Sequence, residues 1–81
     1  MNTDFKRLDV CAWIARGEEP FGRVRAAVEA LGAEEGLLLV APFLPAPLIE
    51  WVKCEGFEAQ VEPGTKGRWL VRIWREAGGA S

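Results

Sequence analysis

The chain has 81 residues, of which 49% are hydrophobic, including four Trp and four Phe, and its net charge at pH 7 is −2. A chain of this length forms one domain, which buries roughly 60% of the surface of its extended form. The hydrophobic residues are numerous enough to form a core that needs no disulfides. Ten basic and twelve acidic residues are interspersed, which gives no basic field to attract nucleic acid. With no His and two Cys, no metal and no cofactor is predicted.

The N-terminal sequence MNTDFKRLDV contains no long apolar run. Neither a signal peptide nor a transmembrane helix is therefore predicted. We expect a cytoplasmic protein with reduced cysteines and no membrane partner.

The first half of the chain predicts a strand and a helix. Lys6–Cys11 alternates, with Leu8 and Val10 on one face and Cys11 on the other, which is typical of a half-buried strand. Residues 12–17 are expected to form a loop. A helix then begins after the acidic and proline residues at 18–20 and carries an apolar stripe, with Gly32 expected as its C-cap. The stripe consists of Phe21, Val24, Val28 and Leu31.

The segment Gly36–Leu48, GLLLVAPFLPAPL, joins the most hydrophobic strand to a second helix. Leu37–Ala41 suits a central strand covered on both faces. Prolines end the sheet pairing and open a helix over Pro45–Glu55, which Gly56 stops. Amide donors gather where a turn meets a helix start. The candidate site for a small ligand or an anion is therefore the turn formed by Pro42, Phe43, Pro45, Ala46 and Pro47.

The last third predicts a hairpin with strands at 57–62 and 68–74. Its predicted pairs are Val61 with Trp69, Ala59 with Val71, and Phe57 with Ile73, all on the buried face. The same register sets Glu62 opposite Arg68 and Glu58 opposite Arg72 on the other face.

The predicted order is βαβαββ, in an α+β fold that forms a two-layer sandwich over residues 1–81, with its core at 6–75. Right-handed crossovers place both helices on one face of a four-stranded mixed sheet of order 1-2-4-3, whose fourth strand is antiparallel to the others. The other face stays bare. Leu70 and Trp74 form an apolar spot there beside Arg72, and this spot is the candidate interface with another protein or with a second copy in a homodimer.

Four stretches resemble the TusA and SirA-like sulfur-carrier superfamily. They are Leu8-Asp9, VRAAVEAL at 24–31, GLLLVA at 36–41 and WLVRIW at 69–74. The segment PFLPAPL at 42–48 is most similar to an uncharacterised bacterial branch of that superfamily. The resemblance implies the fold described above, and a link to redox or sulfur metabolism.

Sulfur carriers of this shape resemble one another in a Cys-Pro-x-Pro segment at the start of the first helix, where the thiol pKa is lowered. Aligning Pro20 with the second proline puts Gly17 at the cysteine position, so the nucleophile is missing. Cys54 falls near the C-terminal end of the second helix, where the helix dipole raises a thiol pKa. We therefore expect no enzyme but a binding or protein-interaction module. One alternative is a sulfur-relay protein that uses Cys11 as a displaced carrier thiol.

A second alternative is an RNA-binding domain. The βαβαββ shape resembles the C-terminal domain of a bacterial translation initiation factor. The acidic balance and the mixed charges of the bare face argue against this alternative.

Overall fold

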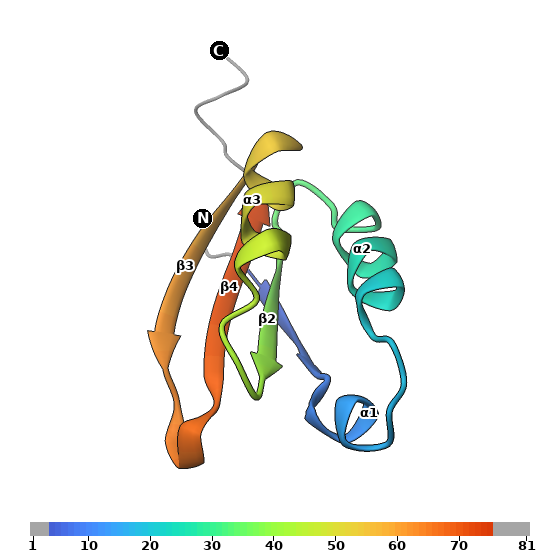
Figure 1. Cartoon of the computed structure of the whole chain (residues 1–81). Helices are drawn as coiled ribbons and strands as arrows, with labels where there is room; N and C mark the ends of the chain where they lie inside the picture. The colour runs from blue at the N-terminus through green and yellow to red at the C-terminus, as the bar shows by residue number, and fades with distance from the viewer. Residues whose placement is uncertain (1–3, 76–81) are drawn as a thin grey trace.

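The computed structural model describes residues 4–75, which form an α+β domain with four strands, three α-helices and one turn of 3-10 helix (Figure 1). The elements in chain order are β1 (Asp4–Asp9), α1 (Cys11–Ala15), α2 (Phe21–Glu29), β2 (Glu35–Ala41), α3 (Ala46–Cys54), β3 (Phe57–Pro63), η1 (Thr65–Gly67) and β4 (Trp69–Arg75). None of the helices in this part of the chain is long and apolar enough to cross a membrane.

The four strands form one mixed sheet of order β1-β2-β4-β3. β1 and β2 are parallel, whereas β4 runs antiparallel to both of its neighbours, β2 and β3. The predicted strand order and strand directions are therefore confirmed.

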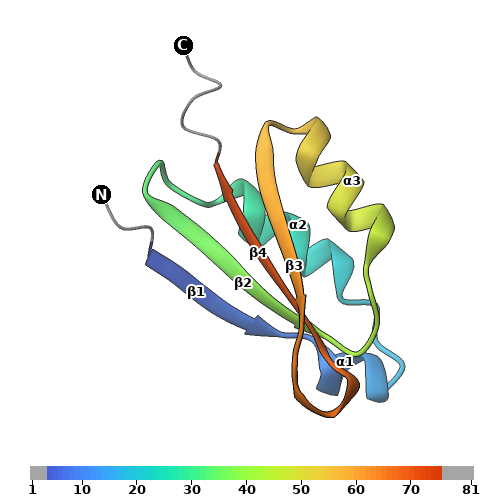
Figure 2. The ribbon, with the colours of Figure 1, turned by 90° about the vertical axis from the view of Figure 1, so that its left-hand side faces the viewer.

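Both longer helices, α2 and α3, lie on the same side of the sheet (Figures 1 and 2). Their buried residues, Val24 and Val28 from α2 and Leu48 and Val52 from α3, join one core with alternate residues of the strands. The strand contribution comprises Leu37, Leu39, Ala41, Phe57, Val71 and Ile73. Each of these larger apolar side chains stabilises the fold by about 1.5–3 kcal/mol when fully buried. In the described part of the chain, residues 4–75, no helix covers the opposite face of the sheet.

The first strand begins and ends two residues earlier than predicted, and the predicted loop after it contains a helix. β1 spans Asp4–Asp9, and Cys11 is the first residue of α1 rather than the last of the strand. The cause is local, because the carboxylate of Asp9 accepts a hydrogen bond of 2.9 Å from the backbone N–H of Cys11. Such a bond turns the chain out of the strand. Trp13 and Ile14 pack against the core.

The hairpin keeps its predicted faces but not its predicted pairs. Val61 lies opposite Val71, Ala59 opposite Ile73, and Glu62 opposite Leu70, which is a shift of two residues. The shift arises because Pro63 still pairs within β3 and the turn comprises residues 64–68. A hydrogen bond of 2.8 Å from the N–H of Gly64 to the carbonyl of Arg68 closes that turn. An even shift leaves every side chain on its own face.

The predicted charge pairs of the hairpin are wrong for the same reason. In the observed register Glu58 lies opposite Trp74, and Gln60 lies opposite Arg72. The carboxylate of Glu62 instead forms an ion pair diagonally with the guanidinium of Arg72.

A side-chain contact fixes the start of α2, and the expected glycine does not cap its end. The carboxylate of Glu19 accepts hydrogen bonds from the backbone N–H groups of Phe21 (2.6 Å) and Gly22 (3.3 Å) at its start. The helix ends at Glu29, and Gly32, which was expected as the C-cap, does not adopt a left-handed conformation.

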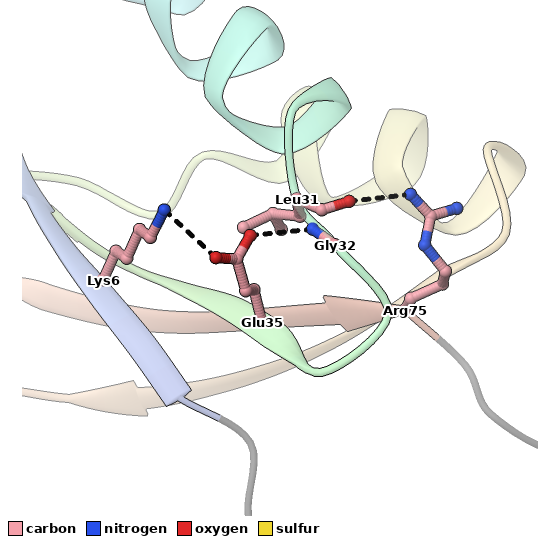
Figure 3. Close-up of polar contacts among 5 residues, drawn as sticks. All are labelled: Lys6, Leu31, Gly32, Glu35 and Arg75. Carbon is pink, nitrogen blue, oxygen red and sulfur yellow. Dashed lines mark hydrogen bonds and ion pairs between the residues drawn. The ribbon is translucent and has the colours of Figure 1, made fainter.

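Polar contacts tie the link between α2 and β2 to the sheet (Figure 3). The N–H of Gly32 donates to Glu35 at 2.8 Å, and the other oxygen of Glu35 lies 3.3 Å from Lys6 Nζ on β1. The Gly32 amide, and then Lys6, hold the pKa of Glu35 below its ordinary value. Arg75 donates to the carbonyl of Leu31 at 3.1 Å, which joins β4 to the same link.

Candidate functional site

The predicted interface residues Leu70, Arg72 and Trp74 all lie on β4 and point to the helix-free face of the sheet. The register places them in three rows that cross the four strands in the order β1-β2-β4-β3. The rows are Phe5-Gly36-Trp74-Glu58, Arg7-Leu38-Arg72-Gln60 and Asp9-Val40-Leu70-Glu62. This set of twelve residues is called the helix-free face below.

The apolar part of the helix-free face is larger than the predicted spot. Leu38 from β2 and Phe5 from β1 lie beside Leu70 and Trp74, whereas Val40 is on the same face but only 1% exposed. The prediction omits Leu38 because it treats Leu37–Ala41 as covered on both faces, and it omits Phe5 because Phe5 precedes the predicted first strand. Alternation along β2, followed across the strand order, indicates that Leu38 lies on this face.

Phe5 and Trp74 form an aromatic pair at one end of this face. Their ring centroids are 6.3 Å apart, with an angle of 85° between the planes, which is the favoured edge-to-face arrangement. Gly36 lies between them in the register and has no side chain to separate them. Phe5 therefore covers part of Trp74, although Phe5 itself is 36% exposed.

Charged side chains surround the apolar residues of the helix-free face, and some of them form ion pairs with one another. Arg7 lies 3.7 Å from Asp9, and Glu62 is paired with Arg72. At the hairpin end, a hollow of about 490 Å³ opens between β1 and the β3–β4 turn. Its lining includes Arg7, Val40, Glu62, Thr65, Arg68 and Leu70.

Both cysteines are free, and the surroundings of Cys11 disfavour its thiolate. Cys11 is half-buried at the start of α1, with its sulfur 3.9 Å from the carbonyl oxygen of Val40. Burial, and then the carboxylate of Asp9, raise the pKa of the Cys11 thiol. Cys54 is exposed at the last position of α3. Cys11 is therefore protonated at neutral pH, where a persulfide carrier needs a thiolate.

The position that aligns with the carrier cysteine, Gly17, has a backbone role. Its φ angle is +79°, a left-handed conformation that favours glycine. The N–H of Gly17 donates to the carbonyl of Ile14 (3.0 Å), and the N–H of Glu18 donates to that of Trp13 (2.9 Å). These two bonds form a Schellman motif that closes α1. A cysteine here would be strained, and it would lie beyond the C-terminal end of a helix.

The predicted ligand turn does not gather amide donors. Pro45 and Pro47 have no N–H, and the N–H of Ala46 already donates to the carbonyl of Leu44 at 3.0 Å. Three of the five predicted residues, Phe43, Pro45 and Pro47, instead line an apolar hollow of about 170 Å³ between the starts of α2 and α3. Phe21, Arg25 and Leu48 complete its lining, whereas Pro42 and Ala46 do not reach it. No pattern in the sequence indicated that α2 contributes to this hollow.

Fold and site together define a small α+β domain with a half-exposed apolar sheet face and a Cys11 thiol whose pKa is raised. Within residues 4–75, no three Cys, Asp or Glu side chains are grouped as metal ligands. A family model described as "Uncharacterized conserved protein (DUF2249)" matches residues 7–75, and the chain belongs to this family. No curated protein and no solved structure matches the chain.

Proposed function

We propose that this protein is a non-catalytic interaction module that binds a second copy of itself through the helix-free face. The observation that supports this function is an apolar strip on the face that no helix covers within residues 4–75, formed by exposed Phe5 and by half-buried Leu38, Leu70 and Trp74. An apolar strip surrounded by charges on an otherwise polar surface is typical of a protein-binding site.

The charges of the helix-free face are compatible with an identical partner. Arg7, Arg72 and the neighbouring Arg68 balance Asp9, Glu58 and Glu62, so that two copies of the face do not repel each other. Strand lengths of six or seven residues and a strand spacing of about 4.8 Å give the face roughly 450 Å². Stable complexes bury about 800 Å² per partner. A weak dimer that dissociates on dilution is therefore expected.

Trp74→Glu should abolish this association, because it places a carboxylate in the apolar contact at the aromatic end of the face. We expect multi-angle light scattering to show a concentration-dependent rise toward the dimer mass for the natural protein and a constant monomer mass for the variant. Phe5→Ser, at an exposed edge position, should weaken the dimer without affecting the core.

Ala26→Glu is the matched control, since Ala26 is exposed on α2 on the opposite side of the sheet. Circular dichroism would verify that all three variants are folded. A natural protein that stays monomeric at millimolar concentration, or folded Trp74→Glu and Phe5→Ser proteins that dimerise normally, would contradict self-association and leave the face to a different partner.

We also propose that the fold is that of the TusA and SirA-like sulfur carriers without their covalent chemistry. The order of the elements and the matching stretches support this relation. The loss of the thiol at Gly17 and the raised pKa of Cys11 favour a non-covalent role. The alternative is a sulfur-relay protein that uses Cys11.

We predict that neither cysteine accepts sulfur from a cysteine desulfurase. The chain would be incubated with desulfurase and cysteine, and intact-mass spectrometry should show no added sulfur atom. Alkylation of Cys11 by iodoacetamide should be slower at pH 7 than that of a free thiol, because the raised pKa leaves less thiolate. A stable added sulfur on Cys11 that disappears in Cys11→Ser would establish the relay function instead.

A further inference from the structure

We propose that the hollow between α2 and α3 holds an aromatic or branched aliphatic side chain of a partner protein, with the carboxylate of an adjacent acidic residue paired with Arg25. The hollow, lined by Phe21, Arg25, Phe43, Pro45, Pro47 and Leu48, is called the α2–α3 hollow. Its lining residues belong to α2, to α3 and to the turn before α3, and none of them belongs to the helix-free face. The two surfaces are therefore independent of each other.

The size and the lining of the α2–α3 hollow suit one apolar side chain. The rings of Phe21 and Phe43 meet edge to face, with centroids 6.4 Å apart. Pro45 is fully buried and Leu48 is 5% exposed, so that these two residues form a fixed apolar floor. The volume of about 170 Å³ is below the roughly 300 Å³ at which pockets for drug-sized molecules begin. A single ring or a branched side chain fits.

The apolar surface continues beyond the hollow, which favours a polypeptide over a small free molecule. Phe43 is 43% exposed and the neighbouring Leu44 is 46% exposed. The segment 36–49 contains no charged residue, and five of the six residues at 42–47 are exposed. Water-exposed apolar surface of this kind is typical of a protein contact. An occupant that anchors one side chain in the hollow would cover Phe43 and Leu44 with its own backbone.

Arg25 makes the α2–α3 hollow favour an occupant with a negative charge. It is the one charged residue in the lining of the α2–α3 hollow. Within residues 4–75, Arg16 and Arg23 lie close to Glu18, whereas Arg25 forms no ion pair. Its guanidinium lies 5.8 Å from the ring centroid of Trp51, which holds it beside α3. A guanidinium next to an apolar hollow attracts a carboxylate through charge-assisted hydrogen bonds.

The test uses the full chain labelled with ¹⁵N. A blocked tripeptide of alanine, phenylalanine and aspartate is added in steps while the amide signals of the protein are recorded by NMR. Saturable shifts are expected at residues 21–25 and 43–48. The aspartate peptide should bind about fivefold more tightly than the same peptide with asparagine, because the charged pair strengthens the hydrogen bond. Arg25→Gln should make the two peptides bind equally tightly, whereas Phe43→Ala should weaken the binding of both peptides about tenfold.

Arg23→Gln is the matched control. Arg23 lies on the same helix but stacks on Trp13 at 4.6 Å, so its loss should leave the fivefold ratio unchanged. Three results would overturn the proposal. They are the absence of saturable shifts, a ratio that persists in Arg25→Gln, and binding of free phenylacetate as tight as that of the tripeptide, which would make the site one for a small acid.

Discussion

Val71→Asp should unfold the domain. Val71 is 0% exposed in the middle of β4, between Leu39 on β2 and Val61 on β3. A carboxylate at this position would enter the apolar layer under the helices, and burying it without a partner costs several kcal/mol. This cost is a large fraction of the roughly 5–15 kcal/mol by which domains are stable. Circular dichroism recorded during heating should show no cooperative thermal transition.

Gln60→Asp is the matched control, because Gln60 is exposed on the neighbouring strand β3 and points to the other face. The same carboxylate there stays in water, so the transition should be retained within a few degrees. If Val71→Asp melted cooperatively close to the natural protein, Val71 would not lie in the core, and the arrangement of the sheet would be wrong.

The sequence was sufficient to predict the fold because periodicity constrains faces. The alternation at 57–62 and 68–74 assigned every hairpin residue to its correct face, and two βαβ crossovers of fixed hand led to the order 1-2-4-3. Alternation does not determine the pairing, since a shift by two residues preserves both faces. The turn decided the register, through the left-handed backbone of Lys66 and Gly67 (φ 56° and 75°). No sequence signal indicated that Pro63 would remain in the strand.

The residues of a candidate site could be predicted only where they belong to one continuous segment of the chain. Leu70, Arg72 and Trp74 share one strand, and the sequence placed them together. The α2–α3 hollow combines Phe21 and Arg25 of α2 with residues at 43–48, and their contact depends on how two helices pack. The position of Cys11 depended on one hydrogen bond, that between Asp9 and the Cys11 amide, which moves the residue from a strand to a helix. Such local competition between side chain and backbone is not visible as periodicity.

Gly36→Val should destabilise the domain and disturb the helix-free face at the same time. A Cβ atom at Gly36 would lie 2.5 Å from the ring of Phe5 and 3.0 Å from the carbonyl oxygen of Ile73. The backbone oxygen belongs to the sheet pairing of β2 with β4 and cannot move away freely. Overpacking of this kind costs about 1–3 kcal/mol. For a domain of this size, a melting temperature lower by about 5–20 °C is expected.

The same substitution separates the aromatic pair, because Phe5 must leave its position against Trp74. NMR should show the ring signals of Phe5 losing the upfield shift caused by Trp74, and light scattering should show a weaker dimer.

Gly22→Ala is the control, and its expected effect on stability has the opposite sign. Gly22 is an exposed position in α2 where the nearest atom to an added Cβ is a Glu19 oxygen at 3.9 Å. Alanine there should raise stability by up to about 1 kcal/mol and leave the dimer unchanged. Equal melting temperatures for the Gly36→Val and natural proteins would show that Phe5 does not lie over β2, and the aromatic end of the proposed interface would then be lost.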